Sequence, residues 1–229
     1  MGMLQMLAWP LHQRALNRMQ ALDQFSEYLS QVQPSKFLAY QNASSNKRSQ
    51  FLAVLESISV VPRNLAFLDL GPGYGDTLDV WHEQGGKSVS FTEIDPFFFT
   101  YNRLKGFTTS YQLNHLSKLR QLPVKSFDVI WCKGAIVADH AILSEKLPLT
   151  TWCFSKWITQ VEQLAVPGGH LVLCPHWRND GTRRRIQDAA GSLLSRRLLD
   201  RGYGILPTVP GHNHEPEYPL TYHQQLDRR

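Results

Sequence analysis

A glycine-rich turn between an apolar run and a helical pattern constrains this chain more than any other feature. The run LAFLDL at 65–70 is followed by GPGYG at 71–75 and then by an amphipathic segment through Leu78 and Trp81. This order indicates a strand that passes directly into a helix. The glycines let the backbone turn tightly and approach a ligand, and the helix N-terminus offers N–H groups. We therefore expect a ligand site at the carboxyl edge of a sheet.

Short apolar runs continue to alternate with longer amphipathic segments toward the C-terminus. Further strands are expected at 88–94, 108–113, 127–132 and 170–175, with helices at 152–164 and 184–199. The PGG at 167–169 should end the first of these helices, and the segments 203–209 and 218–224 should close the sheet as a terminal pair. Alternating strands and helices are typical of an α/β fold with a parallel sheet. The runs FDVIWC and HLVLC lack polar alternation, which fits strands covered on both faces.

Residues 1–62 have a different character and are predicted to form an N-terminal helical extension of a domain at 63–229. Apolar residues recur at three- and four-residue steps between Leu11 and Leu29, and a second such pattern begins at Phe51 and stops near Pro62. A chain of 229 residues suits one domain with an extension better than two full domains. By its place in the chain, the extension would form a lid over the site or a homodimer face.

Composition and cysteine usage exclude several classes of protein. Apolar residues make up 42% and charged residues 19%, which is ordinary globular usage. No apolar run is long enough for a membrane span and no signal peptide is recognisable, so we expect a cytoplasmic protein without membrane attachment. The three cysteines form no CxxC pair and are expected to be reduced and buried. His212, His214 and Glu215 are interpreted as an exposed loop, so no metal site is predicted.

The net charge of +5 is mild, but its distribution is uneven. Seven arginines and three aspartates lie between Arg178 and Arg201. This stretch is either a site for an anionic partner, such as a phosphate, a carboxylate or RNA, or a solvated helix face.

Three kinds of nucleotide ligand can be weighed for the glycine turn. A phosphate-gripping loop needs GxxxxGK followed by Ser or Thr, and the chain has no such string. A dinucleotide turn needs GxGxxG, but Asp76 stands at the last position of that pattern, and a carboxylate there repels a pyrophosphate. A ligand that carries a nucleoside without phosphates meets neither objection.

The segment FLDLGPGYGDTL, in which Asp69 precedes the glycine turn, resembles the first motif of class I S-adenosylmethionine-dependent methyltransferases. Three further pieces follow in the order of that family: FTEIDP, LPVKSFDVIW and LAVPGGHLVLCP. The resemblance covers residues 65–225. It implies a Rossmann-like α/β fold, with a seven-stranded, mostly parallel sheet, helices on both faces and an antiparallel terminal strand pair. It also implies S-adenosylmethionine as the cofactor.

The resemblance also implies roles for particular residues. Asp69 would lie beside the amino-acid end of the cofactor, and Asp95 would accept hydrogen bonds from both ribose hydroxyls, with Glu93 on the same strand face as the reserve. Asp69 capping the turn and Asp95 starting the next helix are the structural alternatives. The remaining implied contacts are the backbone bed of Gly71, Gly73 and Gly75, the adenine contact of Asn114 or His115, and Cys132 where the chain passes under the reactive methyl.

The sequence constrains the methyl acceptor less than it constrains the cofactor. The chain lacks an NPPY-type string after the fourth strand and a paired-cysteine arrangement, both of which mark base methylation in this family. We therefore expect O- or N-methylation of a small molecule, and the arginine-rich stretch would steer an anionic acceptor to the site. An RNA methyltransferase and a catalytically silent methyltransferase-like binding subunit remain alternatives. A hydroxyl acceptor would need a general base, for which His140 and His176 are the candidates. For each histidine, a purely structural role is the alternative.

Overall fold

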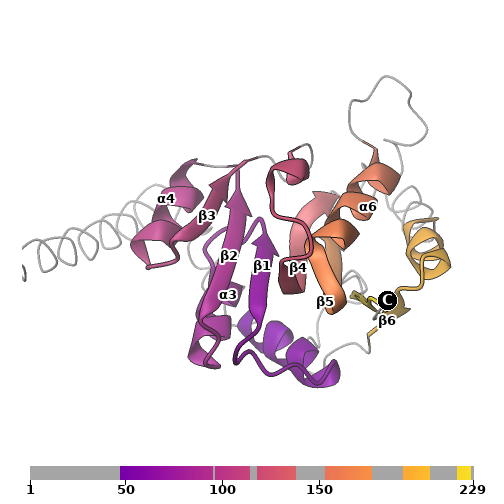
Figure 1. Ribbon diagram of the computed structural model, residues 1–229, viewed down its shortest axis with the longest axis horizontal. Helices are drawn as coiled ribbons and strands as arrows, with labels where there is room; N and C mark the ends of the chain where they lie inside the picture. Colours follow the sequence, from indigo (N-terminus) through magenta and orange to yellow (C-terminus); the bar gives the residue numbers. More distant parts are fainter. Residues whose placement is uncertain are drawn as a thin grey trace, which may run out of the picture.

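The computed structural model describes residues 47–94, 96–113, 118–137, 153–176, 193–206 and 221–227. In this part of the chain, seven strands form one sheet in the order β3-β2-β1-β4-β5-β7-β6. Strands β1 to β5 run parallel, and β7 pairs antiparallel with both β5 and β6. Figure 1 shows β1 near the middle of the sheet, with β2 and β3 on one side and β4 and β5 on the other.

The elements alternate along the chain as the sequence predicts. The strands are β1 (Ala66–Leu70), β2 (Ser88–Glu93), β3 (Thr109–Gln112), β4 (Phe127–Val137), β5 (Ala165–His176), β6 (Gly204–Ile205) and β7 (Tyr222–Gln225). The helices are α3 (Asp76–Glu83), α4 (Pro96–Leu104), the short 3₁₀ helix η1 (Leu119–Gln121) and α6 (Phe154–Leu164), with further helical residues at 47–57 and 193–200.

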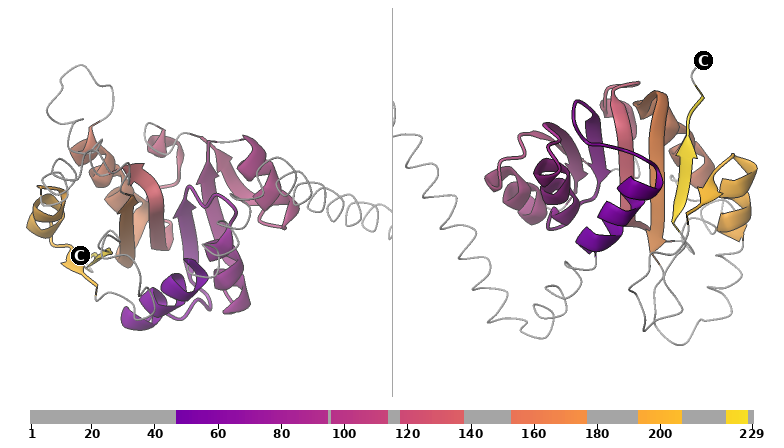
Figure 2. Two further views of the ribbon diagram at one scale, coloured as in Figure 1. Left: turned by 180° about the vertical axis from the view of Figure 1, so that it is seen from behind. Right: turned by 90° about the horizontal axis from the view of Figure 1, so that it is seen from below.

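Side chains of the central strands alternate between two apolar clusters, one on each face of the sheet. On β4, Val129 and Trp131 belong to the first cluster, which also contains Phe51 from helix 47–57 and Trp81 from α3. Ile130 and Cys132, which alternate with them along β4, belong to the second cluster. This cluster also contains residues of α6 and of helix 193–200. Figure 2 shows these helices from two further directions. The sheet is therefore covered on both faces, which explains its uninterrupted apolar runs.

The structure confirms the predicted fold, including the antiparallel terminal pair, and changes some boundaries. The segment 167–169 was expected to be a turn before the fifth strand, but it lies inside β5. Gly168 has φ 84° and the β4–β5 register shifts between Phe127 and Val129, so the glycines allow an irregular strand here instead of a separate turn. The fourth strand continues to Val137, five residues beyond its expected end at Cys132.

Helix 47–57 contributes directly to the core. Its Phe51 is completely buried, and the ring lies 4.8 Å from that of Trp131 and 5.5 Å from that of Phe67, measured between centroids. The predicted helix between Leu11 and Leu29, most of the arginine-rich stretch and the His212 loop lie outside the described residues. Within the described residues, no helix combines the length and apolar character needed to cross a membrane.

Candidate functional site

The glycine turn follows β1 at the carboxyl edge of the sheet, where the sequence places it. Gly71, Gly73 and Gly75 have φ values of 81°, 59° and 76°, in the region that side chains with a Cβ rarely adopt. The Gly71 N–H donates to the carbonyl of Thr92 on β2 at 2.9 Å. Gly75 is the N-cap of α3, so the turn ends where the helix begins. Its glycines are thus required by the backbone conformation.

Asn102 of α4 fixes this turn from one side. Its amide Nδ2 donates to the carbonyl of Gly73 at 2.7 Å and to that of Phe98 at 3.0 Å, and the side chain is fully buried. A Cβ on Gly75 would lie 2.0 Å from Asn102 Oδ1, so Gly75 is also required by close packing. A Cβ on Gly73 would instead have no atom of the described part of the chain within 4 Å. The turn is therefore rigid on its inner side and open at Gly73.

Glu93, the last residue of β2, lies against the same turn. Its carboxylate accepts the N–H of Gly73 at 3.3 Å and the N–H of Ile94 at 2.9 Å, and the side chain is buried. Glu93 thus joins the end of β2 to the open part of the turn.

A cavity adjoins the turn on the sheet face covered by helix 47–57. Asp69 of β1 pairs in register with Trp131 of β4, so their side chains lie on one face, and Lys133 follows two residues later on that face. The cavity is lined by Lys47, Asp69, Gly71, Pro72, Gly73, Asp76, Thr77, Trp131 and Lys133.

Asp69 is a buried carboxyl group at the base of this cavity. Its exposed fraction is 1%, and it accepts a hydrogen bond from the hydroxyl of Thr77 on α3. Burial raises the pKa of Asp69 from 3.8 to about 7, assisted by the nearby charge of Glu93, while the Thr77 hydrogen bond acts in the opposite direction. The group is therefore poised to change its charge near neutral pH.

Lys133 carries the opposite charge across the cavity. Its ammonium donates a hydrogen bond to Oε1 of Gln50 on helix 47–57. Burial lowers the pKa of Lys133 from 10.5 to about 8. The cavity thus contains an acid and a base whose pKa values have moved toward each other, a pattern that is frequent in functional sites.

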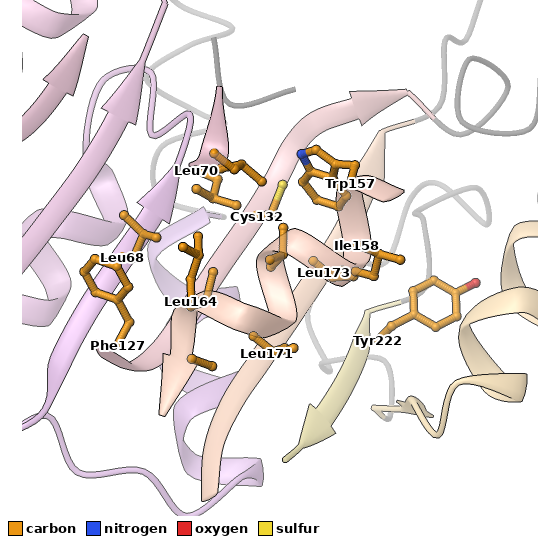
Figure 3. Close-up of a cluster of buried hydrophobic side chains, with 14 of the residues drawn as sticks. Leu68, Leu70, Phe127, Cys132, Trp157, Ile158, Leu164, Leu171, Leu173 and Tyr222 are labelled. Carbon is orange, nitrogen blue, oxygen red and sulfur yellow. The ribbon is translucent and has the colours of Figure 1, made fainter. Parts of the chain in front are cut away.

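The structure brings together Asp69, Gly71, Gly73, Gly75 and Glu93 among the residues predicted for the cofactor. The side chain of Cys132 instead belongs to the cluster on the opposite face, where Figure 3 shows it near Leu70 and Trp157. Strand alternation explains this position, because Trp131 and Lys133 face the cavity and Cys132 must then face away. Asp95, Asn114, His115 and His140 lie outside the described residues, as does the side chain of His176, whose backbone ends β5.

Three cavity residues had no assigned role in the sequence prediction: Lys47, Thr77 and Trp131. Lys133 follows the apolar run FDVIWC, where the chain was expected to pass under the reactive methyl. No sequence pattern connects Lys47 or Gln50 to this edge of the sheet. The three cysteines are thiols, with Cys132 and Cys174 buried and Cys153 half-buried. Among the described residues, no cluster of three or more His, Cys, Asp or Glu side chains could hold a metal ion.

Comparison with known proteins identifies the architecture. No family model matches the chain, and no curated protein matches it in a sequence search. Among solved structures, a putative sarcosine dimethylglycine methyltransferase from Galdieria sulphuraria gives a TM-score of 0.52 at 19% identity, covering 74% of this chain and 64% of that one. The CurJ carbon methyltransferase gives 0.50 at 17% identity, covering 72% and 49%.

This chain has the Rossmann-like fold of S-adenosylmethionine-dependent methyltransferases. The DszA carbon methyltransferase agrees, with a TM-score of 0.51 at 14% identity over 82% of this chain and 55% of that one. This chain therefore spans only about half the length of the two carbon methyltransferases. The predicted class I architecture is confirmed by these structures together with the observed strand order.

Proposed function

We propose that this chain binds S-adenosylmethionine and transfers its methyl group to the oxygen or nitrogen of a small-molecule acceptor. The observation that carries the proposal is the glycine turn, which is held by Asn102 but is open at Gly73, where an added Cβ would have no atom of the described residues within 4 Å. Backbone without a side chain beside a cavity suits close approach of a ligand. The fold and the order of the sequence motifs support the same cofactor.

The charges of the cavity fit such a cofactor better than they fit a phosphate. Three buried carboxyl groups, Asp69, Asp76 and Glu93, lie at or beside the turn. Carboxylates repel a pyrophosphate and attract the sulfonium and amino groups of S-adenosylmethionine. Lys47 lines the same cavity and supplies a positive charge suited to the carboxylate of the cofactor.

Each of these residues then has a role in binding. The turn 71–75 would support the methionine and ribose portion, with Asp69 beside the amino-acid end. Glu93 would accept ribose hydroxyls with the same carboxylate that accepts the N–H groups of Gly73 and Ile94. Asp95 is retained as a second ribose acceptor, Asn114 or His115 as the adenine contact, and His140 and His176 as candidate bases.

The bound cofactor supplies a methyl group that is already activated as a sulfonium. The protein then has to hold the acceptor atom in line with the methyl group and exclude water. Such positioning is worth roughly 7–11 kcal/mol of the barrier. A silent subunit that only binds the cofactor would use the same carboxyl groups, so transfer of the methyl group itself has to be measured to separate the two functions.

A matched pair of glycine variants tests cofactor binding. Gly73 and Gly85 both have positive φ, at 59° and 87°, and an added Cβ has room at each, with the nearest atom at Gly85 being Arg63 Cγ at 3.5 Å. Alanine at either position should cost about 1–2 kcal/mol of stability through backbone strain. Isothermal titration with S-adenosylmethionine and S-adenosylhomocysteine should show binding to the unmodified chain and to Gly85→Ala, and at least tenfold weaker binding to Gly73→Ala. Equal affinity of the two variants, or no binding to the unmodified chain, would contradict the proposal.

A further inference from the structure

Lys133 of β4 lines the cavity and has surroundings that a surface lysine lacks. Lys133 lines the cavity together with Asp69 and Trp131, and its ammonium donates to a neutral amide, that of Gln50. Among the described residues, no carboxylate forms an ion pair with this ammonium. A partly buried ammonium without an ion-pair partner gives up its proton more readily than a fully exposed one.

Among the described residues, the charged and titratable groups near Lys133 come from four neighbouring elements. Asp76 of α3 favours the charged ammonium and Lys47 of helix 47–57 disfavours it, while Asp69 of β1 lines the same cavity. Cys174 lies beside it on β5, in register with Lys133, and burial raises the pKa of this thiol to about 11. The balance leaves the pKa of Lys133 lowered to about 8, with burial as the main cause.

From this placement we infer that Lys133, rather than His140 or His176, is the proton acceptor of methyl transfer, taking the proton of an acceptor hydroxyl or amine as the new bond to carbon forms. This inference rests on the proposed binding of S-adenosylmethionine. A sulfonium in the cavity is a second positive charge close to Lys133, and like charges favour loss of the ammonium proton. Cofactor binding would thereby convert Lys133 into the neutral amine that can act as a base.

The step balances in atoms and charge. A lone pair of the acceptor oxygen or nitrogen forms the bond to the methyl carbon, and the carbon–sulfur bond breaks with its electron pair remaining on sulfur. The acceptor proton moves to the lone pair of Lys133 Nζ. Positive charge therefore passes from sulfur to the lysine, so the net charge of the cavity does not change. A low-dielectric site favours such compensation because an uncompensated charge there is costly.

The inference can be tested without knowing the acceptor, by counting protons released on cofactor binding. S-adenosylmethionine and S-adenosylhomocysteine share the amino-acid and nucleoside groups and differ in the sulfonium methyl. Isothermal titration at pH 7.5 in two buffers of different ionisation enthalpy gives the proton count for each ligand. If the sulfonium lowers the pKa of Lys133 by about one unit, from 8 to 7, it releases about 0.5 proton more than the thioether does.

Variants assign this difference to Lys133. The excess release should disappear in Lys133→Met and in Lys133→Arg, since arginine keeps the charge but does not lose its proton at this pH. It should remain in Lys156→Met, which alters an exposed lysine of α6 on the opposite face of the sheet. Equal proton counts for the two ligands with the unmodified chain would overturn the inference while leaving cofactor binding intact. If Lys133→Met weakens the binding of both ligands equally and the excess proton release is retained, the inference is also overturned. That result would indicate that Lys133 contacts the cofactor carboxylate instead. Absence of binding by either ligand would instead overturn the proposed function and this inference with it.

Discussion

Replacing Asp69 by asparagine should stabilise the fold above pH 7 and weaken cofactor binding at the same time. Asp69 is 1% exposed, and its pKa is raised from 3.8 to about 7, chiefly because burial disfavours the charged form. As the pH rises from about 4 to about 7, the unfolded chain releases this proton while the folded chain keeps it. The folded state therefore loses relative stability over this range and regains none above it.

The shift of about three units sets the size of the effect. One unit corresponds to about 1.4 kcal/mol, so the ionised carboxylate costs the fold up to about 4 kcal/mol at pH 8. Asparagine has nearly the same shape, can accept the hydrogen bond from Thr77, and does not ionise. We expect Asp69→Asn to be about 1–4 kcal/mol more stable than the unmodified chain at pH 8, with the difference vanishing near pH 4.

Urea unfolding at a series of pH values measures this difference, and titration calorimetry measures cofactor affinity. Loss of the carboxylate should weaken binding about ten- to a hundredfold, as expected for a charge-assisted hydrogen bond. Asp128 provides the control, because its carboxylate accepts the N–H of Ala66 at 2.7 Å at the other end of β1. Asp128→Asn should neither stabilise the fold above pH 7 nor change cofactor affinity. The reasoning fails if Asp69→Asn is no more stable than the unmodified chain at pH 8.

Three further substitutions test the surroundings of the site. Phe51→Ala should lower the free energy of unfolding by about 3–5 kcal/mol in urea titrations, because Phe51 is fully buried against Phe67 and Trp131. A loss below about 1 kcal/mol would mean that helix 47–57 does not belong to the core. Asn102→Asp replaces the amide that donates to the carbonyls of Gly73 and Phe98 with an acceptor. It should therefore cost about 1–3 kcal/mol of stability and also weaken cofactor binding. Unchanged cofactor affinity would show that the turn does not need the Asn102 hydrogen bonds. Asp95→Ala should reduce cofactor affinity by about 1–3 kcal/mol in calorimetry if this residue shares the ribose with Glu93, and no change would leave Glu93 as the acceptor.

Much of the fold is predictable because its local signals agree. The turn GPGYG needs positive φ at Gly71, Gly73 and Gly75, and the sequence supplies glycine at all three. The strands around it are short apolar runs, and the alternation of β and α elements leaves few topologies for a parallel sheet. The boundaries of β4 and β5 were predicted less well, because the irregular register near Phe127 depends on contacts between the two strands.

The chemistry of the site was less predictable because it depends on contacts between distant parts of the chain. The raised pKa of Asp69 results from burial under neighbouring elements, which its own sequence surroundings do not specify. The hydrogen bond between Lys133 and Gln50 joins residues 83 positions apart. The position of Cys132 depends on which face of β4 borders the cavity, and this is known only once Trp131 is seen to pair with Asp69.

A crystal structure of the chain with S-adenosylhomocysteine tests the central claim most directly. Density for the adenosyl thioether is expected along the backbone of the turn 71–75, with the ribose hydroxyls at the carboxylate of Glu93 or Asp95. Density for the ligand elsewhere, or a turn covered by the protein's own side chains in the presence of saturating ligand, would contradict the account.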